Sequence, residues 1–247
     1  PRFGVNLTSD NLAMGIIKDK PILRTILQKA LQSITLQERD KLTNSSPSSI
    51  SEVNKGIIFS KEELEFLKSN PTIKVANQLG WKPFDYYENS KPDGYSIDLI
   101  TILLKKVGLN IEFVSGRWSE LQEDFKNKDI DLFPVLAKNK KREESMNFTP
   151  SYIKLHQAII TQRNENSIKS MKDLKGRSVA LVKGWNITKL IAKNYPELNI
   201  IYVDTTKEKL EAVAYGEADA TIDSFTIGIF FFSSFFLDIW ASSTASK

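Results

Sequence analysis

The chain has 247 residues, of which 41% are hydrophobic and 26% are charged, and its formal net charge is +4. This composition is ordinary for a soluble globular protein, and the length suffices for one large domain or two small ones. Lysine and glutamate are interleaved along the chain, which argues against a nucleic-acid-binding face. Cysteine is absent, so disulfides, thiolate metal sites and cysteine nucleophiles are excluded. The single histidine, His156, leaves too few groups for a metal site or a histidine-based triad.

The first 43 residues indicate a strand followed by short helices. Leu12–Ile17 has the character of a short strand, and apolar residues then recur at helical spacing after Pro21, a residue favoured at helix starts. Thr35 to Glu38 forms a possible capping box that begins a second short helix. Helices this short cannot bury their apolar stripes against each other alone, so the segment needs a larger domain to pack against.

Residues 44–56, NSSPSSISEVNKG, are the clearest linker, because they are rich in serine and contain few large apolar groups. A second capping box follows at Ser60–Glu63 and predicts a helix that carries Leu64 and Leu67 on its apolar face. This helix should end by Pro71.

Strand-like and helix-like segments alternate from Thr72 onwards, and the order repeats once. The alternation predicts an α/β protein built on largely parallel sheets. A polar turn is expected at Tyr86–Gly94. The predicted strands are Ile73–Ala76, Leu109–Val114, Ile130–Leu136, Arg177–Val182, Asn199–Val203 and Ala218–Ile222, with helices that begin near residues 97, 118, 186 and 206.

Two short sequence echoes connect the two halves. Val75–Trp81 (VANQLGW) is matched by Val179–Trp185 (VALVKGW), and Lys128–Leu132 (KDIDL) is matched by Gly216–Ala220 (GEADA). Each echo alone is short enough to arise by chance. Because both fall at equivalent places in the same order of elements, they favour two similar lobes.

Three tryptophans, Trp81, Trp118 and Trp185, lie just past the ends of predicted strands. Ligands of parallel α/β sheets collect beyond the carboxyl ends of the strands, and pockets are often lined by aromatic rings. These tryptophans are therefore candidate ligand contacts. Packing inside the lobes is an equally weighted alternative, since large aromatic side chains are buried for their area alone.

A candidate anchoring residue, Arg142, lies in the basic turn of residues 138–152. Pro150 favours extended geometry at the end of this turn, which suits a chain that leaves one lobe for another. A guanidinium group there matches a ligand carboxylate in shape and charge. The alternative is a solvated loop in which Arg142 pairs with Glu143 or Glu144.

In their order and spacing, motifs between residues 60 and 228 resemble the family 3 extracellular solute-binding domains, which are of the bilobed Venus-flytrap type. The resemblance implies a periplasmic-binding-protein-like α/β fold with two three-layer lobes, at about 57–150 and about 151–228, that close on a small solute. The matching motifs are Ile73–Ala76, Trp81-Lys82-Pro83-Phe84, Gly94–Leu99, Asp129-Ile130-Asp131, Arg142 with Phe148–Tyr152, Leu174-Lys175-Gly176 and Gly216–Ala220.

Carried over residue by residue, the resemblance places Arg142 where the family pairs with the carboxylate of amino-acid ligands. It places Trp81 and Trp118 where aromatic rings sandwich the ligand. The hydroxyl-bearing positions just before Arg142 carry proline, valine and alanine here, so much of the α-amino-acid clamp is missing. A flatter or more apolar carboxylate, or no small ligand, is therefore expected. The implied ligand-binding residues are Trp81, Phe84, Trp118, Arg142, Trp185, Asn186 and Ser224; Ser224 holds the position of the acidic group that grips an α-amino group, with Asp223 beside it.

The lead-in at Ser60–Pro71 is similar to the start of flytrap modules arranged in tandem in bacterial membrane sensors, and residues 1–43 resemble the C-terminal remnant of a preceding module. The resemblance implies the periplasmic, ligand-sensing input domain of a sensor of the histidine kinase or diguanylate cyclase type. Its expected partners are a small molecule, the preceding module and a downstream membrane or signalling segment. The alternatives are the binding receptor of an ABC importer for amino acids or other small carboxylates and, less favoured, a dehydratase-like enzyme.

No catalytic residue, cofactor or metal site is expected, because the sequence offers no evident nucleophile–base pair. The aspartates of the motifs are interpreted instead as helix caps or turn residues: Asp98, Asp129, Asp131 and Asp219.

The end of the chain, residues 229–247, shows neither helical nor strand periodicity and departs from the family pattern. The apolar run Phe225–Leu237 is shorter than the roughly 20 residues of a membrane span. The fold is therefore expected to be incomplete at its C-terminus, with a tail that is truncated or altered in frame.

Overall fold

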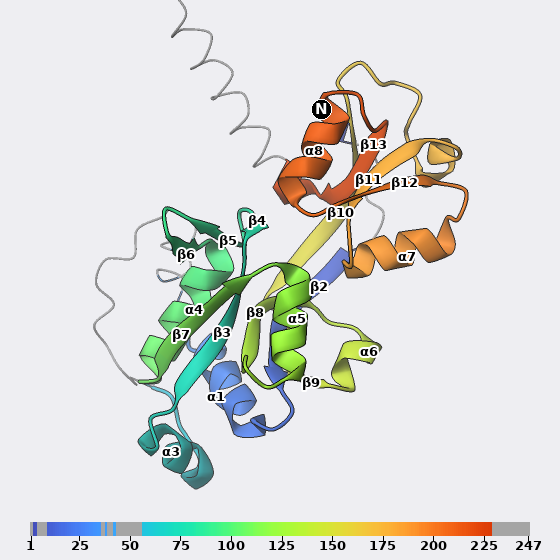
Figure 1. The fold of residues 1–247 in the computed structure, drawn as a ribbon. Helices are drawn as coiled ribbons and strands as arrows, with labels where there is room; N and C mark the ends of the chain where they lie inside the picture. Colours follow the sequence, from blue (N-terminus) through green and yellow to red (C-terminus); the bar gives the residue numbers. More distant parts are fainter. Residues whose placement is uncertain (1, 4–8, 36–37, 39–41, 43–55, 229–247) are drawn as a thin grey trace, which may run out of the picture. The chain divides into compact units, whose positions relative to one another are not determined.

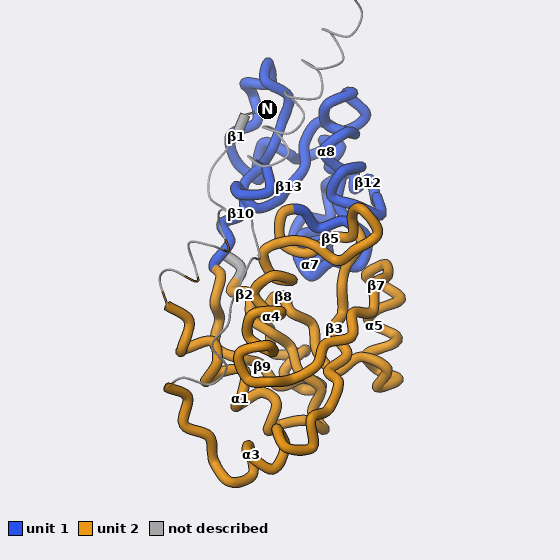
Figure 2. Tube along the Cα trace, turned by 90° about the vertical axis from the view of Figure 1, so that its left-hand side faces the viewer, with its two compact units in different colours: residues 1–10, 80–82, 154–247 blue, residues 11–79, 83–153 orange. Residues whose placement is uncertain are grey.

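The computed structural model describes residues 2–3, 9–35, 38, 42 and 56–228. Most of the predicted linker and the whole predicted tail lie outside these residues. The chain forms two compact units (Figure 2). Unit 1 contains residues 1–10, 80–82 and 154–247, and unit 2 contains residues 11–79 and 83–153.

Unit 2 is built on a mixed sheet with the strand order β2-β8-β3-β7. β3 (Thr72–Gln78) is parallel to β7 (Asn110–Gly116) and to β8 (Leu132–Ala137), and β2 (Ser9–Ile17) is antiparallel to β8. The short strand β9 (Met146–Phe148) also pairs with β2 in antiparallel register, at Gly15–Ile17.

Helices cover both faces of this sheet (Figure 1). Side chains alternate along the strands, so Val75 and Leu132 pack with α1 (Pro21–Gln32) and α4 (Tyr95–Lys106), whereas their neighbours Ala76 and Phe133 pack with α5 (Trp118–Lys126). The result is the three-layer arrangement that the family resemblance implies, built on the α/β alternation that the sequence predicts.

Unit 1 repeats this plan with the strand order β12-β11-β13-β10. β11 (Ser178–Val182) is parallel to β12 (Asn199–Val203) and to β13 (Ala220–Ser224), and β10 (Ile153–Thr161) is antiparallel to β13. β1 (Arg2–Phe3) pairs with β10.

The helices of unit 1 also lie on both faces of its sheet. Val179 and Leu181 pack with Ile191 of α7 (Asn186–Asn194) and with η1 (Met171–Leu174), while Ala180 packs with α8 (Thr206–Ala214). The two units thus share one strand order and one layering, as the sequence echoes predict.

The segment before the predicted linker packs into unit 2. Leu23, Ile26 and Leu27 of α1 are fully buried in the same cluster as β3 and α4. Two ion pairs add to this packing: Lys29 with Glu63 at 2.5 Å, and Lys106 with Glu38 at 3.0 Å. The strand and helix of the predicted module remnant therefore supply part of the core of unit 2.

The capping box at Ser60 is confirmed, because Ser60 Oγ accepts the amide of Glu63 and the Glu63 carboxylate accepts the amide of Ser60. It begins α3 (Lys61–Lys68). The predicted apolar face is wrong in part, since Leu64 is 45% exposed whereas Glu63 is buried. The ion pair with Lys29 allows the Glu63 carboxylate to take the inward position.

The segment predicted as a polar turn, Tyr86–Gly94, contains a hairpin. β5 (Asp85–Glu88) pairs with β6 (Lys91–Asp93) in antiparallel register. Asn89 and Ser90 join the strands, and both have positive φ angles, of 52° and 61°. A two-residue loop of this kind matches the right-handed twist of the strands, which the polar composition alone did not indicate.

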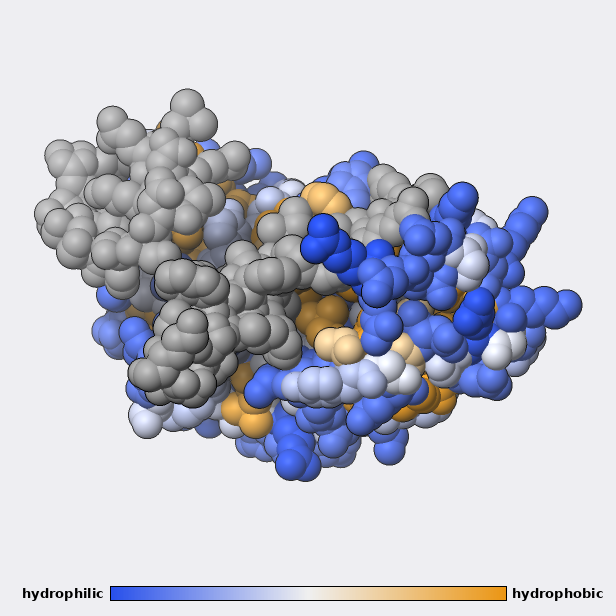
Figure 3. Space-filling model, turned by 90° about the horizontal axis from the view of Figure 1, so that it is seen from above, coloured by the Kyte–Doolittle hydropathy of each residue, from blue (hydrophilic) through white to orange (hydrophobic). Residues whose placement is uncertain are grey.

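Charged and polar side chains dominate the described surface on the face drawn in Figure 3, with smaller apolar areas between them. No helix among the described residues is long and apolar enough to cross a membrane.

Candidate functional site

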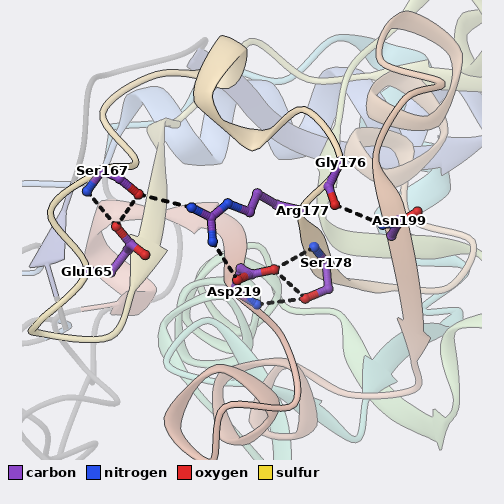
Figure 4. A network of polar contacts seen from close by, with 7 residues as sticks. All are labelled: Glu165, Ser167, Gly176, Arg177, Ser178, Asn199 and Asp219. Atoms are coloured by element: carbon purple, nitrogen blue, oxygen red, sulfur yellow. Dashed lines mark hydrogen bonds and ion pairs between the residues drawn. The ribbon is translucent and has the colours of Figure 1, made fainter.

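A polar network fixes the amino ends of the parallel strands in unit 1 (Figure 4). The Asp219 carboxylate accepts hydrogen bonds from the Ser178 amide at 2.8 Å and from its hydroxyl at 2.7 Å. Arg177 pairs with Asp219 at 3.1 Å and donates to Ser167 at 3.2 Å, and Ser167 donates to the carboxylate of Glu165. These contacts hold the strands together at their amino ends. Ligands of such sheets bind at the opposite edge, beyond the carboxyl ends of the strands.

In unit 2, two of the predicted site residues lie together. The guanidinium carbon of Arg142 is 5.4 Å from the centre of the Trp118 ring, a cation–π arrangement. Arg142 also donates to the carbonyl of Ala137 at 2.7 Å, and its amide donates to the Asn139 side chain at 3.0 Å. Asn139 thereby caps α6 (Lys140–Glu143), which sets the position of Arg142.

Trp118 is the first residue of α5, directly beyond β7. Its ring packs on Phe133, with centroids 5.3 Å apart. The indole Nε1 is shielded from solvent and has no hydrogen-bond acceptor within the described part of the chain. Because a buried donor without an acceptor is costly, this N–H is a candidate donor to a ligand. Of the two glutamates considered as partners of Arg142, Glu143 and Glu144, the first pairs with Lys138 at 3.0 Å.

A second buried polar cluster in unit 2 surrounds Asp85, which the sequence reasoning did not select. Asp85 is fully buried and accepts from the Asn77 side chain at 2.7 Å and from the Gln78 amide at 3.1 Å. Burial raises the pKa of Asp85 to about 7, and these hydrogen bonds only partly oppose that effect. Asn77 in turn accepts from Ser115 at 2.7 Å, so the cluster joins the ends of β3 and β7 to the start of β5.

Phe84, another predicted contact, is 5% exposed and lies in the core of unit 2. Its carbonyl accepts the amide of Ser96 at the start of α4. Gly94 packs directly on the Phe84 backbone, where a Cβ would come within 2.7 Å of it. Phe84 therefore sets the start of α4.

In unit 1, the predicted residues Trp81 and Trp185 meet edge to face, with ring centroids 5.6 Å apart. Trp185 caps the amino end of α7 just beyond β11, and Asn186 is the first residue of that helix. Ser224 is fully buried at the end of β13, where its hydroxyl accepts the amide of Ile227.

The sequence reasoning missed Lys209, which is the most enclosed lysine among the described residues of unit 1. Lys209 is 1% exposed, and its ammonium lies 2.5 Å from Asp223 Oδ2. It is also 4.8 Å from the centre of the Trp185 ring. Its sequence context does not distinguish it, because three other charged residues lie within two positions of it: Lys207, Glu208 and Glu211. Such a segment is expected to form a solvent-exposed start of a helix.

The geometry of the two units can be compared with known proteins. A model for the bacterial extracellular solute-binding proteins of family 3 matches residues 73–202, just over half of the chain. The chain belongs to this family. Among solved structures, the periplasmic VFT2 domain of Bordetella pertussis BvgS superposes on 70% of the chain and 75% of the domain, with a TM-score of 0.62 and 24% identity. The family 3 chain therefore has the Venus-flytrap, periplasmic-binding-protein-like fold that the motifs predict.

Two kinds of relatives resemble this family 3 chain. The probable amino-acid-binding protein YxeM of Bacillus subtilis is 31% identical over 148 residues, which are 59% of this chain and 56% of YxeM. The virulence sensor protein BvgS of Bordetella bronchiseptica is 24% identical over 216 residues, which are 86% of this chain and 17% of BvgS. The matched part thus spans about half of YxeM and under a fifth of BvgS.

Within the described residues, no group of three or more histidine, aspartate or glutamate side chains is arranged to hold a metal ion. The polar groups beyond the carboxyl ends of the strands include an arginine with an indole N–H in unit 2, and a lysine–aspartate pair under an indole ring in unit 1.

Proposed function

We propose that this chain binds a small carboxylate in the periplasm as the ligand-sensing input domain of a bacterial membrane sensor. The observation that carries the binding proposal is the pairing of Arg142 with the Trp118 indole, whose buried N–H has no acceptor in the described structure. A carboxylate there would pair with the guanidinium and accept from Nε1. Membership of a solute-binding family supports binding over catalysis.

The sensor role is favoured by the extent of the matches. The similarity to BvgS of Bordetella bronchiseptica covers 86% of the chain, whereas the similarity to YxeM covers 59%. Residues outside the family model therefore also have counterparts in a sensor. A preceding module and a downstream signalling segment, of the histidine kinase or diguanylate cyclase type, belong to this proposal.

The second candidate is a binding receptor for an importer, and the identity of 31% to a probable amino-acid-binding protein favours it. The two functions differ in what the complete gene encodes: a sensor gene continues into a membrane segment and an output domain, and a receptor gene does not. The sequence of the whole gene decides between them.

Calorimetry with a panel of small carboxylates tests the binding proposal. Arg142→Ala should weaken the best carboxylate by about 2 kcal/mol or more, because it removes a charge-assisted contact. Trp118→Phe should weaken it by about 1 kcal/mol through loss of the N–H donor. Arg163→Ala, at an exposed arginine of unit 1, is the matched control. Equal affinities for the Arg142 and Arg163 variants would refute this site, and no heat with any carboxylate at millimolar concentration would refute the function.

A further inference from the structure

Unit 1 contains a complete ammonium-binding site made of three different groups. Its carboxylate is Asp223, which is 3% exposed; its carbonyl is that of Ile222; and its aromatic face is the Trp185 ring. Carboxylate, carbonyl oxygen and indole face are the groups that bind a primary ammonium ion.

The ammonium in this site is the side chain of Lys209. Its Nζ lies 2.5 Å from Asp223 Oδ2, 3.4 Å from the Ile222 carbonyl oxygen and 4.8 Å from the Trp185 ring centre. The contact with Oδ2 is an ion pair without the alignment of a hydrogen bond. The other oxygen, Oδ1, accepts the Ser224 amide at 2.6 Å, so the carboxylate is held from both sides.

The position of this site makes it relevant to ligand binding. Asp223 is the penultimate residue of β13, and Trp185 follows the end of β11 by three residues, so both lie at the carboxyl ends of parallel strands. Ligands of α/β sheets collect at these ends. The burial of Lys209 there is costly unless its charge is paired, and the carboxylate of Asp223 supplies the opposite charge.

We propose that Lys209 fills, from within the chain, the ammonium site formed by Asp223 and Trp185. The solutes that this chain recognises are consequently carboxylates without an amino group directed at Asp223, and α-amino acids gain nothing from their ammonium group. The statement about solutes rests on the proposed binding function. The statement about Lys209 does not.

Chemical rescue tests the site itself. Lys209→Ala removes the ammonium and three methylene groups, which n-propylammonium can replace. Thermal unfolding of the variant should shift to lower temperature by several degrees, and n-propylammonium should restore the midpoint in a saturable manner. 1-Propanol, which lacks the charge, should not. Lys207→Ala, on the same helix but with a side chain 68% exposed, is the matched control and should show neither effect.

Rescue by 1-propanol as strong as that by n-propylammonium would overturn the proposal, as would an equal effect of n-propylammonium on the Lys207 variant. If Lys209→Ala does not fold, the variant can be refolded with and without n-propylammonium, and failure of the cation to increase the folded yield counts against the site. The double variant Lys209→Ala/Asp223→Asn should lose the rescue, because the carboxylate that binds the cation is neutralised.

Matched solutes test the specificity on the unaltered chain. Calorimetry compares each α-amino acid with the acid that lacks its amino group, for example glutamate with glutarate. The amine-free acid should bind at least as tightly. An amino acid that binds tenfold more tightly than its amine-free partner would overturn the inference while leaving the binding function intact. If neither solute of any pair binds, the binding function fails, and the rescue of Lys209→Ala still decides whether the ammonium site is filled by the chain.

Discussion

Asp131 and Asp219 form the same pair of backbone contacts in the two units. Asp131 Oδ2 accepts the amide of Lys74 at 3.0 Å, and the Asp131 amide donates to the carbonyl of Lys74 at 2.9 Å. Asp219 Oδ2 accepts the amide of Ser178 at 2.8 Å, and the Asp219 amide donates to the carbonyl of Ser178 at 3.0 Å. The sequence echo between Lys128–Leu132 and Gly216–Ala220 thus corresponds to one hydrogen-bonding arrangement. It occurs once in each unit and holds the amino ends of neighbouring parallel strands together.

Replacing either aspartate should destabilise its unit. Asp131→Ala and Asp219→Ala should each lower the free energy of unfolding by about 2 kcal/mol, since each removes a hydrogen bond to a charged acceptor and leaves a strand amide unpaired. Urea denaturation measures the change. Asp129→Ala is the control for Asp131, because Asp129 lies two residues away and is exposed. Losses that do not exceed the control value would contradict the role assigned to the carboxylates.

Acid should remove the contribution of Asp219. Burial alone would raise the pKa of Asp219, but hydrogen bonds from Ser178 and the contact with Arg177 outweigh it, so the pKa lies below the ordinary value of 3.8. The stabilisation is therefore present above pH 3.8 and is lost as the pH falls through the lowered pKa. The difference in stability between the unaltered chain and Asp219→Asn should shrink below about pH 4. A difference that is constant from pH 7 to pH 3 would show that the charge is unimportant.

Most regular elements of both sheets could be predicted from the sequence, because their apolar residues follow simple periods. β3, β7 and β8 and the helices between them lie within a few residues of the predicted ranges. The hairpin of β5 and β6 could not be predicted, because DYYENSKPD is rich in charged and polar residues and has no alternating apolar pattern. Its turn also depends on positive φ angles at Asn89 and Ser90. The exposure of Leu64 could not be predicted either. It follows from the burial of Glu63, whose partner Lys29 lies 34 positions away in the sequence.

Gly94 should tolerate no side chain. Its φ angle is +116°, and a Cβ would lie 2.7 Å from the backbone of Phe84. Gly94→Ala should therefore lower the free energy of unfolding by more than about 3 kcal/mol. Gly108→Ala is the control, because Gly108 has a φ angle of +75° but open space around it, and should cost about 1 kcal/mol. Thermal or urea denaturation of the two variants provides the comparison, and equal losses would mean that the close approach to Phe84 does not matter.

Asp85 should make unit 2 less stable as the pH rises. The folded chain retains a proton on Asp85 up to about pH 7, whereas an unfolded chain loses it near pH 3.8. Folding therefore takes up a proton between these values, and the contribution of Asp85 to stability falls by about 1.4 kcal/mol per pH unit at most. Asp85→Asn should remove this dependence.

The measurement is the difference in unfolding free energy between the unaltered chain and Asp85→Asn from pH 4 to pH 8. The unfolding free energy of Asp85→Asn should rise relative to that of the unaltered chain as the pH rises. A parallel pair of curves would show that Asp85 is ionised in the folded state across the whole range. Asp93→Asn, at a half-buried aspartate of the same hairpin, is the matched control.

The segment before the linker should be essential to unit 2. Leu27 of α1 is fully buried against β3 and α4, so Leu27→Ala should cost about 3 kcal/mol. Leu64→Ala, at a leucine that is 45% exposed, should change stability by less than about 0.5 kcal/mol. Urea denaturation separates the two, and a negligible effect of the Leu27 change would show that α1 contributes little to this core.

The candidate site could be predicted only in part. Trp118 and Trp185 were selected because they follow predicted strand ends, and Arg142 because it lies in a basic turn. In the structure Arg142 lies over the Trp118 ring, and Lys209 lies over the Trp185 ring. Lys209 and Asp85 were not selected, since burial of an ionisable group depends on tertiary contacts that leave no periodic trace. Asp223 was noted only as a neighbour of Ser224, and its ion pair with Lys209 connects residues in different elements.

The strand order of unit 2 has a further consequence for how the chain can be divided. β2 and α1 precede residues 43–55 in sequence, yet β2 pairs with β8 and α1 packs with β3 and α4, which all follow those residues. These contacts can hold the two parts of the chain together without a covalent connection. A protease site engineered between residues 47 and 48 should, after cleavage, yield two fragments that co-elute on gel filtration as one nicked particle. Urea should be needed to separate them, and the shorter fragment should re-enter the longer one on dilution.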